Sequence, residues 1–231
     1  MTQNSDTGPS LWRHPGTYRT LPFGVFIALM LLEPVLEPIL PAALDPRWLY
    51  GIRSLVVGVV LALLWRQFHE LRDTERASAG DWGLGIGLGI LVFLLWINLD
   101  FKPLAFAPDQ GFDPTVGDRV HLGFLITRIA GAALVVPVME ELFWRSFILR
   151  WLQKSTFLKV DPRSLRWSPI LISSLVFASE HRLWFAGILA GVAYAWLYKR
   201  SGNLWVPIVS HAITNFLLGI YVVATAAWWF W

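Results

Sequence analysis

The sequence predicts an all-α fold: a polytopic transmembrane helical bundle with about seven spans. Hydrophobic residues fill 55% of the 231 positions, and the mean hydropathy is +0.53. Only 15% of the residues are charged, whereas about 25% is usual for a soluble domain. Long stretches with few charges recur along the chain, and each is close to the roughly 20 apolar residues that a helix needs to cross a bilayer.

Seven segments are long and apolar enough to be interpreted as membrane-spanning helices. Tryptophans stand at several of their ends, among them Trp48, Trp65 and Trp82, as is typical of residues at the membrane interface. The final segment, 203–231, contains no Asp, Glu, Lys or Arg, so two short spans there, eight in all, are an alternative. The predicted spans are roughly 20–42, 48–65, 82–99, 120–145, 168–181, 183–198 and 204–227.

No internal repeat divides the chain, so we expect one transmembrane domain over residues 18–231. The first ten residues, MTQNSDTGPS, are polar and lack a basic segment, so we expect no cleavable signal peptide. Residues 1–17 are predicted to be a short disordered tail. The freest loops are expected at 72–81 and 100–118.

Charge and cysteine content exclude several function classes. The net charge of +3 is small and scattered, so nucleic acid is not an expected partner, and the absence of cysteine excludes disulfides and thiolate metal sites. Alternating spans place twelve Lys and Arg residues on one side and five on the other. Because positive residues favour the cytoplasmic side, we expect a cytoplasmic amino terminus.

Three charged residues interrupt the apolar stretch VVPVMEELFWRSFILRW, at Glu140, Glu141 and Arg145. Charges inside a span are costly and usually face the bundle interior. Glu141 and Arg145 are four residues apart, so they share a helix face and can form an ion pair. Glu140 points about 100° away from Glu141, which leaves it free for chemistry. A salt-bridged helix end at the membrane interface is the alternative.

Two later segments carry further polar residues. His181 lies near the junction of the fifth and sixth spans, and His211 and Asn215 are four apart on an otherwise apolar helix. A lone histidine in a membrane helix often serves only as a hydrogen-bond partner between helices. Together, however, a free carboxylate, two imidazoles and a carboxamide supply a base, an orienting partner and donors, as acyl transfer to water requires.

The order and spacing of these residues match a known family. Glu140-Glu141-Leu-Phe-Trp-Arg145 is similar to an EExxxR motif, Phe177-Ala-Ser-Glu-His181 to FxxxH, and His211-Ala-Ile-Thr-Asn215 to HxxxN. The chain resembles the type II CAAX prenyl proteases and their bacterial relatives, the CPBP (CAAX protease and bacteriocin-processing) family. The resemblance covers about residues 120–220, which would be the protease core.

The resemblance implies a glutamate-dependent endopeptidase that needs no metal or other cofactor. It implies that Glu140 and His181 activate a water molecule, that His211 and Asn215 stabilise the oxyanion, and that Arg145 holds the motif helix through Glu141. The implied partners are the lipid bilayer and a membrane-anchored protein or peptide substrate, of which prenylated CAAX-type proteins are one class. We expect a bacterial inner (plasma) membrane enzyme. One tension is that the predicted span ends put His181 near the outer side and Glu140 toward the cytoplasm.

Two alternatives use the same residues. Two histidines and a glutamate can form a catalytic zinc site, although no HExxH arrangement is present. A non-catalytic scaffold or transporter is the other alternative, because broken spans and buried charges also mark transporters.

Three further features have structural interpretations. Glu33 and Glu37 each precede a proline, which indicates a bend in the first span. Arg128 is expected to be a buried partner for one of these glutamates or for a backbone carbonyl. The glycines of GLGIGLG, residues 83–89, have small-residue packing spacing.

Overall fold

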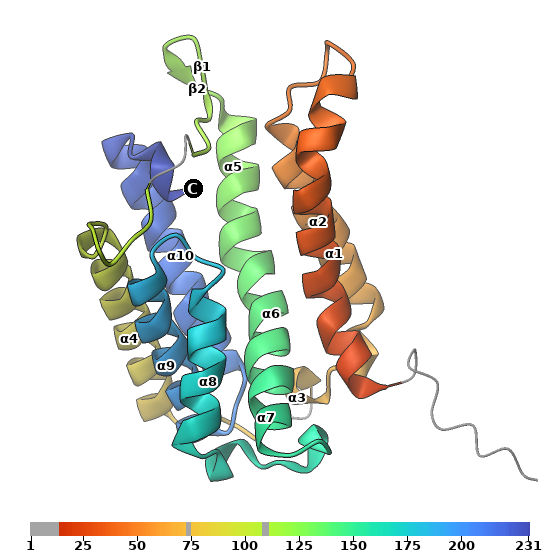
Figure 1. Cartoon of the computed structure of the whole chain (residues 1–231), viewed down its shortest axis with the longest axis vertical. Coiled ribbons are helices and arrows are strands. Elements are labelled where there is room, and N and C mark those ends of the chain that lie inside the picture. Colours follow the sequence, from red (N-terminus) through yellow and green to blue (C-terminus); the bar gives the residue numbers. More distant parts are fainter. Residues whose placement is uncertain (1–13, 73–74, 108–110) are drawn as a thin grey trace, which may run out of the picture.

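The protein is an all-α bundle, as the sequence predicts (Figure 1). The computed structural model describes residues 14–72, 75–107 and 111–231. Within these residues the only sheet is a hairpin of β1 (Thr115–Val116) and β2 (Arg119–Val120), with Gly117 in its turn at a φ of +61°. The separate helices are α1 (Pro15–Leu36), α2 (Trp48–Leu63), α3 (His69–Arg72), α4 (Ala79–Asn98), α8 (Trp167–Ala178), α9 (Trp184–Ser201) and α10 (Trp205–Thr225).

One continuous helix of 32 residues, Leu122–Gln153, runs through the middle of the bundle (Figure 1). It contains two π-helical stretches, which are rare and often accompany functional sites. The second stretch begins directly after Glu141. We call this helix, Leu122–Gln153, the motif helix because it carries Glu140, Glu141 and Arg145. Its segments are α5 (Leu122–Ala130), η4 (Gly131–Val135, π), α6 (Val136–Glu141), η5 (Leu142–Leu149, π) and α7 (Arg150–Gln153).

Each predicted span corresponds to one helical segment. Four segments in the described residues are long and apolar enough to cross a membrane: Pro15–Ile39, Ala79–Asn98, Leu122–Gln153 and Trp205–Thr225. Two others, α2 and α8, are shorter apolar helices. The final segment forms one helix, α10, rather than two short spans. Short 3₁₀ helices complete the connections: η2 (Glu37–Ile39), η3 (Trp65–Gln67), η6 (Phe157–Lys159), η7 (Pro162–Ser164) and η8 (Trp228–Phe230).

The amino-terminal helix begins earlier than the sequence predicted. Residues 1–13 lie outside the described residues, but α1 starts at Pro15, inside the predicted tail of residues 1–17. Proline suits the first helical position, and the His14 side chain caps the helix by accepting a hydrogen bond from the Gly16 amide at 3.1 Å. The boundary at residue 18 was therefore placed three residues too late.

Glycines bring α4 close to α10. A Cβ atom on Gly89 would lie 2.5 Å from the Ser210 carbonyl oxygen, and one on Gly85 would lie 3.1 Å from Val206. Both glycines are buried. The predicted packing role of the GLGIGLG segment is confirmed for these two positions, and it places α10 where its polar residues can face the motif helix.

The loop that follows α4 is fixed in place, contrary to the prediction of a free loop over 100–118. Asp100 accepts a hydrogen bond from Arg182 at 2.6 Å, and the Phe106 amide donates to the Arg182 carbonyl at 2.9 Å. The Trp184 indole also donates to the Pro103 carbonyl at 3.0 Å. This loop therefore covers the turn between α8 and α9, which its polar composition alone does not indicate.

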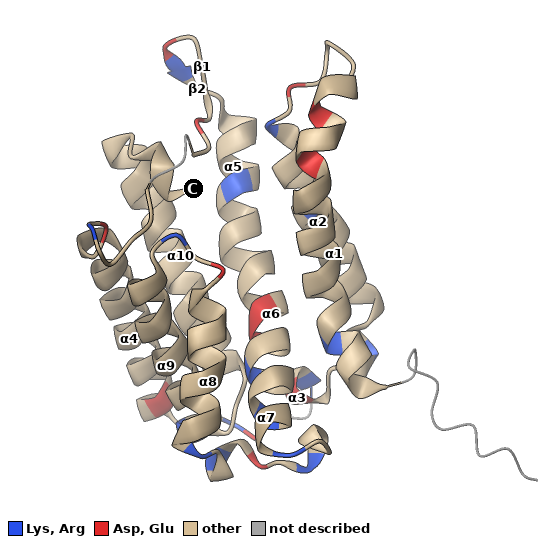
Figure 2. Cartoon of the chain, viewed as in Figure 1, with Lys and Arg blue, Asp and Glu red and all other residues tan. Residues whose placement is uncertain are grey.

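A buried charged cluster fastens α1 to the motif helix. Arg19 has no exposed surface and pairs with Glu70 of α3 at 2.5 Å. Glu70 also contacts Arg150 at 3.2 Å and accepts a hydrogen bond from Ser146. Burial alone would raise the pKa of Glu70, but its hydrogen bond with Arg19 and the charges of Arg19 and Arg150 outweigh burial and lower it. Figure 2 shows basic residues gathered at this end of the bundle.

Candidate active site

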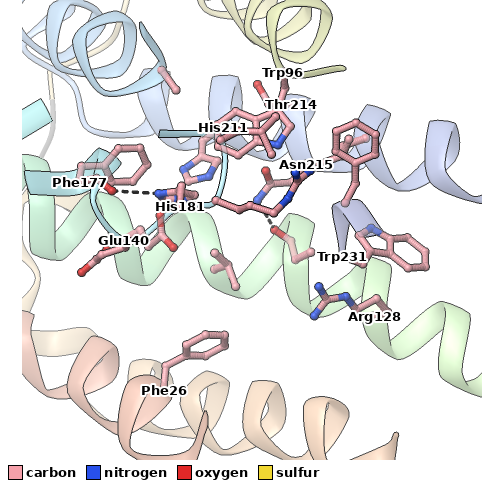
Figure 3. Close-up of a pocket in the computed structure, with 18 of the residues that line it drawn as sticks. Phe26, Trp96, Arg128, Glu140, Phe177, His181, His211, Thr214, Asn215 and Trp231 are labelled. Atoms are coloured by element: carbon pink, nitrogen blue, oxygen red, sulfur yellow. Dashed lines mark hydrogen bonds between the residues drawn. The ribbon is translucent and has the colours of Figure 1, made fainter. Parts of the chain in front are cut away.

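A cavity of about 540 Å³ lies between α1, the motif helix, the α8–α9 turn and α10. Its size is within the range of roughly 300–1,000 Å³ that is usual for ligand sites. All four candidate catalytic residues line it: Glu140, His181, His211 and Asn215 (Figure 3). They come from three separate parts of the chain, so the fold brings together the polar groups that the sequence singled out.

The two adjacent glutamates have different environments. Glu141 is fully buried and pairs with Arg145 at 3.1 Å, which confirms the predicted ion pair. Glu140 is 9% exposed and lines the cavity. Its Oε2 atom has no hydrogen-bond partner among the described residues. A buried carboxylate oxygen without a partner is unusual, and here it belongs to the glutamate that the helix geometry left free.

Glu141 has a second partner that the sequence did not predict. Nδ1 of His211 lies 3.1 Å from its Oε1 atom. The ring of His211 stacks on Tyr194 with the centroids 4.9 Å apart. The Tyr194 hydroxyl donates to Thr214 at 2.8 Å, and Thr214 donates to the Gly89 carbonyl at 2.8 Å. His211 is therefore held by a carboxylate on one edge and an anchored ring on one face.

His181 reaches the cavity because α8 is short. Twelve residues span only about 18 Å, at about 1.5 Å each, against a hydrocarbon core of about 30 Å. The turn after Ala178 therefore lies beside the cavity, which removes the tension between the predicted positions of His181 and Glu140. Nδ1 of His181 lies 2.9 Å from the Phe177 carbonyl, and Trp96 packs edge-on against its ring.

Asn215 is tied to the first π-helical stretch of the motif helix. Its Nδ2 atom donates to the carbonyl of Ala132, in η4, at 2.8 Å. An amide nitrogen carries two N–H groups, so one remains for another acceptor. The fourth residue after His211 is thus oriented by the same helix that carries Glu140.

The hydrogen bonds of the two histidines set which ring nitrogen carries a proton. A carbonyl or a carboxylate can only accept, so Nδ1–H is the donor in both His181 and His211. A neutral ring then presents a lone pair at Nε2. With this tautomer, His211 offers an N–H at Nε2 only when both ring nitrogens carry a proton.

Among the described residues, no three His, Asp or Glu side chains lie close enough together to bind one metal ion. Sequence reasoning missed Tyr194 and Thr214 as residues of the site, and it also missed that Glu180, beside His181, lines the cavity. Thr214 lies inside the HxxxN segment beside Asn215, and that position was the available signal. Tyr194 gives no sequence signal beyond being polar in an apolar helix.

The expected ion pair between Arg128 and a glutamate of the first span is not formed among the described residues, although the charge of Arg128 acts on Glu33. Glu33 pairs with Arg53 at 2.8 Å, not with Arg128. The guanidinium of Arg128 lies 4.0 Å from the centroid of the Tyr50 ring. The predicted bend is present, since α1 ends at Leu36 and continues as η2.

Comparison with known proteins supports the resemblance given by the motifs. The family model described as type II CAAX prenyl endopeptidase Rce1-like matches residues 122–217. A protein of Bacillus subtilis (strain 168) named "Putative membrane peptidase YdiL" is 25% identical over 219 residues, covering 86% of this chain and 83% of the relative. No solved structure matches the chain.

The family model covers the segment that contains all three motifs, and the relative extends over most of both chains. Both matches describe a peptidase, and the long apolar helices make this chain an integral membrane protein. The part of the chain that carries the three motifs is therefore similar to the CPBP family of membrane peptidases.

Proposed function

We propose that the protein is an intramembrane endopeptidase that hydrolyses a peptide bond of a membrane-anchored protein with a water molecule activated by Glu140. The observation that carries this proposal is the buried, unpartnered Oε2 of Glu140 in a cavity shared with His181, His211 and Asn215. A carboxylate with a free oxygen in such a site suits a general base.

The proposed reaction begins with a water molecule between Glu140 and His181. Glu140 takes one proton while the water oxygen attacks the scissile carbonyl carbon, and Nε2 of His181 accepts a hydrogen bond from the same water. The carbonyl oxygen becomes an oxyanion. As the C–N bond breaks, Glu140 returns the proton to the leaving amine, so the enzyme ends in its starting state.

The oxyanion would be met by two donors. Asn215 has a second N–H beyond the one given to Ala132. His211 provides an N–H at Nε2 when both of its ring nitrogens carry a proton, and the Glu141 carboxylate holds the Nδ1 edge of the ring. Preorganised donors of this kind contribute more in a water-excluded site than in water. In this proposal Glu141 serves both Arg145 and the oxyanion site.

The substrate, topology and location are part of the same proposal. Phe26 and Met30 of α1 line the cavity, so an apolar wall faces the bound chain, as suits a membrane-anchored substrate. Prenylated CAAX-type proteins are a candidate class because the matching family model carries that description. We propose a bacterial plasma membrane, because the relative named as a membrane peptidase comes from a bacterium, with the amino terminus in the cytoplasm as the Lys and Arg distribution favours.

The test is cleavage of membrane-anchored reporters by purified protein in vesicles. Glu140→Gln should remove cleavage, because Gln cannot accept the proton from water. Glu37→Gln is the matched control, since Glu37 is exposed and outside the cavity lining; it should retain full activity. Full activity of Glu140→Gln at matched stability would overturn the mechanism and favour the scaffold alternative.

Metal dependence is tested in parallel. Under the metal-free proposal, activity should survive prolonged chelation, and the purified protein should contain far less than one zinc ion per chain by elemental analysis. Loss of activity on chelation that is restored by added zinc would establish the zinc alternative instead.

A further inference from the structure

Three arginines line the cavity, and two of them have carboxylate partners. Arg53 pairs with Glu33 at 2.8 Å, and Arg182 pairs with Asp100 at 2.6 Å. Arg128 forms no ion pair or hydrogen bond with any residue in the described part of the chain, and its Nε atom is buried. A cation within a membrane helix normally finds a partner or marks a functional site. Arg128 is therefore the cavity arginine that has no ion pair among the described residues.

Aromatic rings surround this guanidinium. Its charge also acts on Glu33, whose ion pair is with Arg53. Its central carbon lies 4.0 Å from the centroid of Tyr50, 5.4 Å from Phe112 and 5.8 Å from Trp231. Figure 3 shows Arg128 and Trp231 together at one end of the cavity, away from Glu140. Rings exclude water from the guanidinium, and in such surroundings an opposite charge is attracted more strongly than in water. The site is therefore built to favour an anion.

The motif helix places Arg128 and Glu140 on the same wall of the cavity. Ala132 and Val136 lie between them at intervals of four, and both also line the cavity. On an ideal α-helix twelve residues at about 100° each would leave Arg128 and Glu140 about 120° apart. The π-helical stretch η4 lies between them. Its i→i+5 bonds reduce the rotation per residue, which brings both side chains to one face.

We propose that Arg128 is a specificity subsite that binds a carboxylate of the substrate, about five residues from the scissile bond. The inference rests on the proposed peptidase function. Twelve residues correspond to about 18 Å of helix axis, and an extended peptide covers about 3.3 Å per residue, which gives roughly five residues. The carboxylate is an Asp or Glu side chain or the substrate's own carboxyl terminus; a lipid phosphate is the competing source of negative charge.

The experiment uses reporter substrates whose segment around the scissile bond is uncharged and whose carboxyl terminus is amidated. In a series of these reporters, a single Asp is placed at each position from one to eight residues before or after the scissile bond. We expect kcat/KM to peak about five residues away, through a lower KM. Arg128→Gln should remove the peak and lose about ten- to hundredfold at that position, as for a charge-assisted hydrogen bond. Arg119→Gln, in the exposed β2 strand, is the control and should keep the peak.

A charge swap separates recognition from a structural role. If Arg128 only clamps Tyr50, then Arg128→Glu loses activity on every reporter. Under the proposal, Arg128→Glu instead prefers a reporter with Lys at the peak position, and Lys at other positions gives no gain. A flat Asp profile in the wild-type protein, or a peak that survives in Arg128→Gln, would overturn the inference.

Two further experiments distinguish a substrate carboxylate from a lipid phosphate, and test the subsite independently of the proposed peptidase activity. The Asp preference should be the same in phosphatidylcholine and in phosphatidylglycerol vesicles; an effect of Arg128 that appears only with the anionic lipid assigns the site to a headgroup and overturns the inference. Binding of fluorescent Asp and Asn peptides to Glu140→Gln measures the subsite without turnover. Preferential Asp binding that depends on Arg128 supports the subsite even if no reporter is cleaved, whereas equal binding rejects it.

Discussion

Nδ1 of His211 lies 3.1 Å from Oε1 of Glu141, and the other oxygen of that carboxylate lies 3.1 Å from Nε of Arg145. One buried glutamate thus joins α10 to the motif helix. Glu141, the second glutamate of the motif, therefore has a different environment from Glu140, the first. Glu141 holds His211 and Arg145, while Glu140 has no hydrogen-bond partner for its Oε2 atom among the described residues.

Arg145→Ala should lower stability as well as activity. Removing one partner of a buried pair leaves an uncompensated charge, which costs about 3–5 kcal/mol. The measurement is thermal unfolding of the purified variant in detergent. Arg200→Ala is the control, because Arg200 is half exposed where it pairs with Asp81, and such surface pairs contribute about 0–1 kcal/mol. An unchanged unfolding temperature with lost activity would move Arg145 from structural support into the catalytic set.

Asn215→Ala should reduce cleavage but leave a measurable rate. Loss of one oxyanion donor typically lowers kcat by about 10²–10³, and the protonated His211 remains as the second donor in the proposed mechanism. The comparison is with Glu140→Gln, which should leave almost no activity on the same reporter. Equal residual rates in the two variants would contradict the division into base and oxyanion donor.

The pH dependence of stability should reveal the cluster of Arg19, Glu70 and Arg150. The pKa of Glu70 is lowered in the folded state, so its contribution is fully present above the unfolded value of about 4.5. That contribution is lost as the pH falls through the lower folded pKa. We therefore expect the unfolding temperature of the wild-type protein to fall more steeply below about pH 4.5 than that of Glu70→Gln.

At neutral pH the same comparison has a second expected result. Glu70→Gln should already be less stable than the wild-type protein, because the buried Arg19 loses its partner. Parallel pH curves for the two proteins would show that Glu70 has the same pKa in the folded and unfolded states, contrary to the geometry of the cluster.

Hydropathy and helix geometry were sufficient for the parts of this molecule that depend on local sequence. Each apolar segment became one helix, because every backbone group in lipid must find an internal partner. The Glu141–Arg145 pair followed from a spacing of four on one helix. The separation of Glu140 from Glu141 followed from the angle between successive residues. These conclusions need no knowledge of which helices are neighbours.

Tertiary contacts account for what the sequence left out. The bond between His211 and Glu141 joins residues 70 positions apart, and no local pattern indicates it. The depth of His181 depends on where α8 ends, and the loop at Asp100 is fixed only through Arg182. The π-helical stretches cannot be recognised from hydropathy, because apolar residues suit α- and π-helix alike. They nevertheless decide which side chains share the cavity face.

Tyr194 should act as a positioning residue for His211, and two substitutions separate its ring from its hydroxyl. Tyr194→Phe retains the ring that stacks on His211 and loses only the hydrogen bond to Thr214, worth about 0.5–1.5 kcal/mol of stability. Its kcat should stay near that of the wild-type protein. Tyr194→Leu removes the stacked face, so His211 is free to rotate away from the oxyanion position, and kcat should fall while KM changes little. The check is steady-state cleavage at a temperature where both variants are folded. If Tyr194→Phe loses as much kcat as Tyr194→Leu, the hydroxyl rather than the ring supports the site, and the path from Gly89 through Thr214 becomes the element that holds it.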